Sequence, residues 1–97
     1  MKSHTLKILP EYYTDIVTGI KPFEVRENDR DFKRGDLLQF KHVDDEVLYP
    51  GVWIITYVLK GGQFGIDPLY VVLGISMFNT PHKSDTLQTV LVKKGQL

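Results

Sequence analysis

Apolar and polar residues alternate along much of this chain, and successive side chains of a β-strand point to opposite faces. The alternation predicts strands where apolar residues recur at every second position. Alternation and runs of β-branched and aromatic residues together predict five strands, at residues 4–9, 21–28, 37–43, 52–59 and 70–76. The stretch 52–59 is apolar on both faces, which is typical of a central or strongly curved strand.

A helix is predicted between the first two strands. Its apolar residues recur at i, i+3, i+4 and i+7, at Tyr13, Ile16, Val17 and Ile20. Pro10 suits the first helical position, and Gly19 can adopt the left-handed conformation that ends many helices. Lys21 therefore stands directly after the helix, at the start of the second strand.

Two connections carry further local signals. Residues 29–36 are mostly polar, with Phe32 as an apolar anchor that we expect to pack beneath the loop. Residues 60–65 contain three glycines but no following helix, which argues against a phosphate-binding loop and favours a hairpin connection.

The last part of the sequence has two interpretations. Asp85 and Gln88 have the spacing of a capping box, and apolar residues near them fall at helical spacing, so a C-terminal helix is the favoured prediction. The many β-branched residues in the same segment favour a strand instead. We therefore separate a core at residues 1–77 from a tail at residues 78–97.

Together these elements predict an α+β fold that is mainly β. Several short strands with one helix after the first indicate a small, curved, mostly antiparallel sheet or barrel, with the helix at one end. A length of 97 residues suits a single domain and is too short for a second independent module. Such a barrel leaves a groove where its strand edges diverge, which is a natural place for a ligand.

Composition argues against several classes of function. Twelve basic and twelve acidic residues give no net field toward nucleic acid or an acidic membrane, so any anion site must be local. Cysteine is absent, and His4, His42 and His82 lack ligand spacing, so we expect neither a metal site nor a cofactor. The longest apolar run, at residues 69–75, is far shorter than a membrane span, and no signal peptide is expected. A soluble cytoplasmic protein is the resulting expectation.

The second strand concentrates the candidate chemistry. Its alternation places Phe23 and Val25 on an expected core face, and Glu24 and Arg26 on the opposite, working face. Arg26 can hold a phosphate or carboxylate bidentately, Glu24 can accept from a base amino group, and Lys21 can neutralise an anion. The alternative is a salt-bridge cluster that only satisfies a polar groove.

Neighbouring residues extend this candidate site. Asn28 shares the face of Glu24, and Arg30 can either contact a phosphate or close its own loop with Asp29. His4 is expected beside the pocket because its strand should adjoin the second strand, with a surface position as the alternative.

The balance of charge limits the kind of ligand. Residues 21–36 contain five basic and five acidic side chains. A long phosphate backbone needs several uncompensated cations, so a single nucleotide or an unstacked base is favoured. Tyr12 and Tyr70 are the candidates for stacking on such a base, with a place in the core as the alternative.

Two motifs carry a resemblance to a known family. The pattern H-x-L-K-I-x-P-x-Y begins at His4, and G-x-K-x-F-E-x-R-x-N-D-R-x-F-x-x-G-D-x-L runs from Gly19 to Leu38. With residues 65–73, they resemble a small domain family of unknown function in the ASCH group, which shares a PUA-like β-barrel. The resemblance implies a pocket that presents the G-x-K-x-x-E-x-R signature to a ligand, and RNA is a common ligand of PUA-like folds.

One branch of the ASCH group is an amidohydrolase that removes the acetyl group from acetylated cytidine nucleosides with a lysine, a threonine and a glutamate. Lys21 matches the lysine, Glu24 stands at the threonine position, and Asp67 is the acid nearest to the glutamate position. The hydroxyl nucleophile is therefore missing. The resemblance implies an RNA- or nucleotide-binding module with its site at Lys21, Glu24 and Arg26. The alternatives are a nucleoside hydrolase that uses Lys21 and Glu24, and a small interaction protein.

Overall fold

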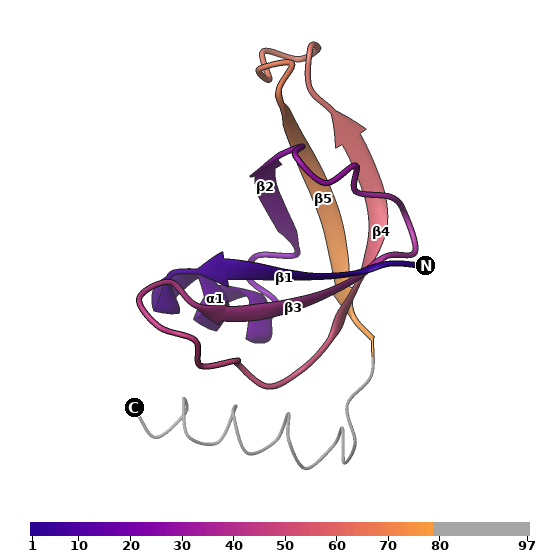
Figure 1. Ribbon diagram of the computed structural model, residues 1–97. Coiled ribbons are helices and arrows are strands. Elements are labelled where there is room, and N and C mark those ends of the chain that lie inside the picture. Colours follow the sequence, from indigo (N-terminus) through magenta and orange to yellow (C-terminus); the bar gives the residue numbers. More distant parts are fainter. Residues whose placement is uncertain (79–97) are drawn as a thin grey trace.

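The computed structural model describes residues 1–78, which form five strands and one helix (Figure 1). In chain order these are β1 (Ser3–Ile8), α1 (Pro10–Val17), β2 (Phe23–Glu27), β3 (Leu37–His42), β4 (Trp53–Lys60) and β5 (Tyr70–Met77). The strands begin and end within two residues of their predicted positions. The predicted C-terminal helix and its strand alternative lie outside the described residues. Within residues 1–78, no helical segment has the length and apolar character needed to traverse a bilayer.

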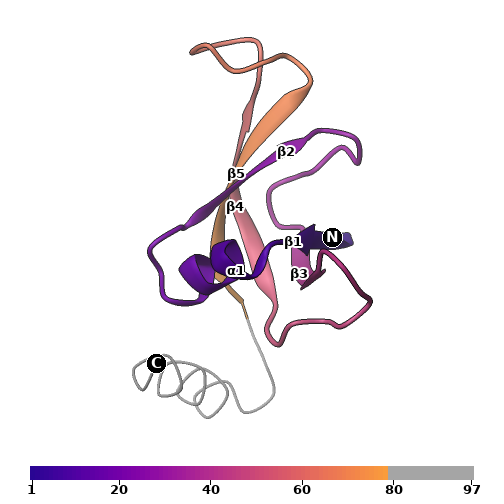
Figure 2. The ribbon, with the colours of Figure 1, turned by 90° about the vertical axis from the view of Figure 1, so that its left-hand side faces the viewer.

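All five strands belong to one curled sheet, in the order β1-β3-β4-β5-β2. β1 and β3 are parallel, and the other neighbours are antiparallel. The sheet curls into a half-barrel whose two edges are β1 and β2 (Figure 1 and Figure 2). This arrangement confirms the predicted fold, which is α+β and mainly β. It also confirms the central, curved position of β4, whose register shifts between Ile55 and Tyr57.

The pairing of β1 corrects one prediction. The sequence predicts that the strand of His4 adjoins the second strand, but β1 pairs with β3. In this register His4 stands beside Leu38, and Leu6 stands beside Phe40. All four side chains are buried, so the pairing joins the inward rows of two strands.

An apolar core fills the concave side of the half-barrel. α1 packs into it with Tyr13, Ile16 and Val17 (Figure 2), and Phe32 is buried beneath its loop, as the sequence predicts. The sheet contributes Leu6, Ile8, Leu38, Phe40, Trp53, Ile55, Val71, Leu73 and Ile75. The prediction for Ile20 is wrong, because the helix ends at Val17 and Ile20 is exposed.

β2 alternates as predicted, but its two faces are the reverse of the expected ones. Glu24 is only 4% exposed, whereas Phe23 and Val25 are 42% and 50% exposed. Glu24 stands opposite Leu73 of β5, which is fully buried, so the charged face of β2 turns into the half-barrel. This reversal is tolerated because the inward charges pair with one another and with the backbone of the facing edge strand, β1.

Candidate functional site

A pocket of about 420 Å³ opens between the edge strands β1 and β2 and the start of α1. It brings together Lys21, Glu24 and Arg26, the three residues at the centre of the predicted site. We call it the Glu24 pocket. Its lining consists of Lys7, Ile8, Leu9, Tyr12, Lys21, Glu24, Val25, Arg26 and Val43.

Glu24 is the centre of the polar group in this pocket. Its Oε1 accepts a hydrogen bond from Lys21 Nζ, and its Oε2 accepts one from Arg26 Nε at 2.8 Å. A carboxylate this deeply buried needs such partners, because the loss of its hydration is costly. Each carboxylate oxygen therefore has one cationic donor, and these two contacts hold the carboxylate in place.

The end of α1 holds Lys21 in position. The backbone N–H of Lys21 donates to the Asp15 carbonyl at 3.0 Å, and its Nζ donates to the Phe23 carbonyl at 2.9 Å as well as to Glu24. Nζ also lies 5.5 Å from the ring centroid of Tyr12 and 5.1 Å from that of Phe23, within cation–π range. As predicted, Lys21 is fixed at the joint between the helix and the second strand.

Arg26 spans the gap between the two edge strands. Its Nε bonds Glu24, and its Nη2 donates to the Lys7 carbonyl of β1 at 2.6 Å. No hydrogen bond of Arg26 Nη1 is found within residues 1–78, so one arm of this pocket-lining guanidinium has no acceptor there. Such an arm suits a phosphate or carbonyl oxygen.

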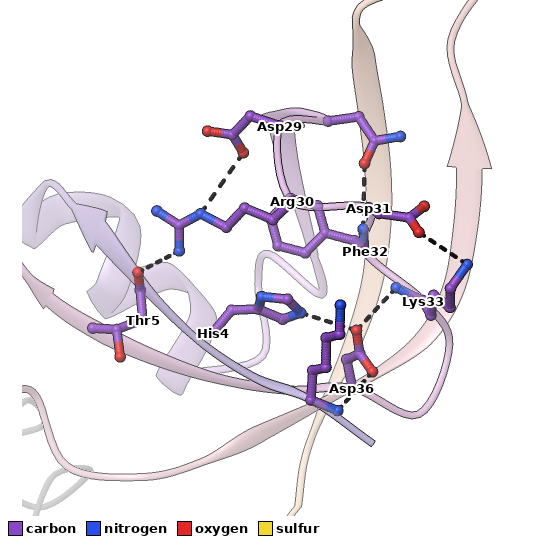
Figure 3. Close-up of polar contacts among 10 residues, drawn as sticks. His4, Thr5, Asp29, Arg30, Asp31, Phe32, Lys33 and Asp36 are labelled. Carbon is purple, nitrogen blue, oxygen red and sulfur yellow. Dashed lines mark hydrogen bonds and ion pairs between the residues drawn. The ribbon is translucent and has the colours of Figure 1, made fainter.

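A second polar cluster, the Asp36 cluster, lies where β1 meets the loop before β3 (Figure 3). Asp36 Oδ2 lies 2.9 Å from His4 Nε2. The backbone N–H groups of Lys2 and Lys33 each donate to the Asp36 carboxylate at 3.1 Å. Burial alone would raise the pKa of Asp36, but these three hydrogen bonds outweigh it and hold the pKa below its ordinary value. His4 therefore lies in this cluster and does not line the Glu24 pocket.

The loop after β2 fixes Asn28 and Arg30. Asn28 Oδ1 accepts the Phe32 N–H at 3.3 Å, which closes the turn. Arg30 Nη1 donates to the Thr5 carbonyl of β1 at 2.8 Å, and its Nε lies 3.7 Å from Asp29 Oδ1 (Figure 3). Neither Asn28 nor Arg30 lines the Glu24 pocket.

The two tyrosine candidates lie on different sides of the sheet. Tyr70 stands opposite Glu27 on the outer face, whereas Val71, the next residue, points into the core. Tyr12 lines the Glu24 pocket and is 47% exposed. The structure thus places Tyr12, and not Tyr70, at the site.

Sequence reasoning missed the part that β1 plays in this site. The backbone carbonyls of Lys7 and Thr5 accept hydrogen bonds from Arg26 and Arg30. Every residue has a backbone carbonyl, so the pattern of side chains cannot predict these contacts. It also missed Asp36 as a centre of hydrogen bonds. A signal was present there, because an aspartate after glycine in a turn often binds nearby backbone N–H groups.

Comparison with known proteins places the chain in a family. The sequence profile of a domain of unknown function, DUF3850, matches residues 3–75. The chain belongs to this family. The DUF3850 match contains every residue that lines the Glu24 pocket, together with His4 and Asp36. It confirms the predicted membership of a domain family of unknown function. No match was found among curated proteins.

The pocket of this DUF3850 domain offers hydrogen-bond donors beside apolar walls. Arg26 Nη1 supplies the donor, and the exposed ring of Tyr12 provides a flat surface. Ile8, Leu9 and Val43 form apolar parts of the lining. The complementary ligand has a flat, partly apolar body and an acceptor oxygen.

Proposed function

We propose that this DUF3850 domain is a PUA-like module of the ASCH group that binds one nucleotide-like unit in the Glu24 pocket. The unit is either a free nucleotide or an unstacked base of RNA. The observation that carries the proposal is the deeply buried Glu24, held by Lys21 and Arg26 in an open pocket beside an exposed tyrosine. Buried charges add little net stability compared with apolar packing, so a ligand is the better reason for their presence.

The groups in the pocket support a definite orientation of the ligand. A base can stack on the ring of Tyr12, as bases do on the aromatic residues of single-strand binders. Its phosphate or a carbonyl oxygen can then accept from Arg26 Nη1. The PUA-like assignment is supported by the half-barrel with a helix after its first strand.

The charge distribution favours a single unit over a long strand. The chain has twelve basic and twelve acidic residues, and residues 21–36 have five of each. A polynucleotide that ran across this surface would find few uncompensated cations to replace its counterions.

An NMR titration tests the proposal. We expect the four ribonucleoside monophosphates, or short RNAs, to shift the amide signals of residues around the Glu24 pocket. Lys21→Ala and Arg26→Lys should abolish these shifts while the remaining amide spectrum shows a folded protein. Lys33→Ala is the matched control, because Lys33 Nζ pairs with the exposed Asp31 and lies outside the pocket lining. The absence of shifts with every nucleotide and RNA would refute the proposal.

Hydrolysis of a modified nucleoside is a second candidate, favoured by the direct contact between Lys21 Nζ and Glu24 Oε1. In an acetylated cytidine, water would add to the acetyl carbon as Glu24 takes its proton. The C–N bond would then break, and the amine would leave with a proton from Lys21. Release of acetate from N4-acetylcytidine that is lost in Lys21→Ala would support this candidate. If the protein binds N4-acetylcytidine but releases no acetate, the hydrolase is contradicted and the nucleotide-binding proposal is retained.

A further inference from the structure

The two edge strands of the half-barrel are joined through arginine side chains. β1 and β2 stand at opposite ends of the strand order, and no backbone ladder connects them within residues 1–78. Arg26 Nη2 donates to the Lys7 carbonyl at 2.6 Å, and Arg30 Nη1 donates to the Thr5 carbonyl at 2.8 Å. Thr5 and Lys7 are alternate residues of β1, so the two guanidinium groups hold the same side of one strand.

We propose that Arg30 is a positioning residue for the Glu24 pocket, which it shapes by fastening β1 to β2. The walls of the pocket come from both strands, with Lys7 and Ile8 on β1 and Glu24, Val25 and Arg26 on β2. The distance between the strands therefore sets the width of the pocket. The effect on a ligand rests on the function proposed above, whereas the fastening itself does not.

Arg30 is better suited to this task than Arg26 alone. Arg26 lines the pocket, so its guanidinium would have to hold the Lys7 carbonyl and a ligand at the same time. Arg30 lies outside the pocket lining, so its bond to Thr5 persists while a ligand is bound.

The turn that carries Arg30 is firmly anchored. Phe32, two residues later, is buried in the core, and its N–H bonds Asn28 Oδ1 at 3.3 Å. Figure 3 shows the Arg30 side chain reaching from this turn to Thr5, with Asp29 on the other side of the guanidinium. Arg30 thus connects a fixed turn to an edge strand.

Three variants test the positioning role. Arg30→Met keeps most of the length of the side chain and removes its donors, and Arg30→Lys restores one donor. Lys33→Met is the control, because it removes an exposed ion pair with Asp31 from the same loop. AMP, CMP, GMP and UMP serve as the probes of binding.

We expect Arg30→Met to weaken nucleotide binding about fivefold, as befits the loss of one hydrogen bond. Arg30→Lys should recover part of this loss, and Lys33→Met should bind like the wild type. Arg30→Met should also shift the Nε–Hε signal of Arg26 and speed amide exchange in residues 3–8. These two readouts need no ligand. If Arg30→Met does not fold, the same measurements compare Arg30→Lys with the wild type.

The outcomes separate the two proposals. An unchanged Arg26 signal together with unchanged exchange in β1 would overturn the fastening. Changes in both, with nucleotide affinity equal to that of the wild type, would overturn the positioning role. If no nucleotide binds even the wild type while both readouts respond to Arg30→Met, the proposed function fails and the fastening of β1 to β2 stands.

Discussion

At the scale of single residues, Asp36 shows how one buried carboxylate joins separate parts of the chain. It binds the backbone of Lys2, the side chain of His4 on β1 and the backbone of Lys33 in the loop before β3. The hydrogen bonds lower its pKa despite burial. A lowered pKa in the folded state means that the ionised form stabilises the fold above the unfolded-state pKa, and that this stability is lost as the pH falls through the folded-state pKa.

We expect Asp36→Asn to lower the free energy of unfolding at pH 7 by about 2 kcal/mol, because an amide nitrogen would face a hydrogen-bond donor. The gap between the variant and the wild type should narrow as the pH falls below the ordinary aspartate value of 3.8. Urea denaturation of both proteins between pH 7 and pH 2.5 measures this difference in the free energy of unfolding. Asp31→Asn is the control, since Asp31 is exposed. A gap that stays constant over this range would contradict the role of the lowered pKa.

Glu24 carries the second prediction at this scale. Glu24→Gln should destabilise the fold by about 2 kcal/mol, because it removes the buried negative charge between Lys21 and Arg26 and turns an amide N–H toward one of them. Thermal unfolding followed by circular dichroism measures the loss. Glu27→Gln is the matched control, because Glu27 lies on the same strand and is exposed. Equal stability of the two variants would contradict the pairing role of Glu24.

At the scale of elements, β2 shows where the sequence stops being informative. The alternation of Phe23, Glu24 and Val25 correctly predicts a strand with two unlike faces. The alternation does not say which face is buried. The usual expectation, that the apolar face is the buried one, is wrong for β2. That choice depends on the cations around Glu24 and on the β1 carbonyls that receive Arg26. The grouping of Lys21, Glu24 and Arg26 was predictable because the three residues are local in sequence.

The hairpin between β4 and β5 depends on the absence of a side chain at Gly61. A Cβ there would lie 1.9 Å from the Asp67 carbonyl oxygen and 2.7 Å from that of Tyr70. We therefore expect Gly61→Ala to cost about 2 kcal/mol, by urea denaturation, since backbone atoms must move.

Gly65→Ala is the comparison for this prediction. Gly65 has φ of +76° and open space around its Cβ position, so only the positive φ opposes alanine, at a cost of about 1 kcal/mol. A smaller loss in Gly61→Ala than in Gly65→Ala would contradict the steric argument.

At the scale of the whole molecule, the elements and the fold class followed from the sequence, but the closure of the half-barrel did not. The hydrophobic pattern locates each strand because its period is local. The β1–β3 pairing joins residues 3–8 to residues 37–42, and no local pattern encodes that choice. The arginine contacts to β1 were equally hidden, because their acceptors are carbonyls that every residue carries.

The balanced charge of the molecule leads to a prediction about salt. If a short RNA binds through one unit at Arg26, the logarithm of its affinity should fall with the logarithm of salt concentration with a slope of about −1. Fluorescence anisotropy of a labelled RNA between 50 and 300 mM salt, about a sixfold range, measures this slope. A slope of about −4 or steeper would show that the RNA contacts several phosphates and would contradict the single-unit site.

The position of Trp53 gives the protein a built-in optical reporter. It is the only tryptophan of the chain, and it is buried on the central strand. Its ring centroid lies 5.4 Å from that of Phe40 and 6.0 Å from that of Tyr13 on α1. Its emission should shift to longer wavelength when helix and sheet separate. Because Trp53 does not line the Glu24 pocket, nucleotide binding should leave its emission wavelength nearly unchanged. Unfolding can therefore be followed through Trp53 emission in the presence of a nucleotide, without a signal from binding itself.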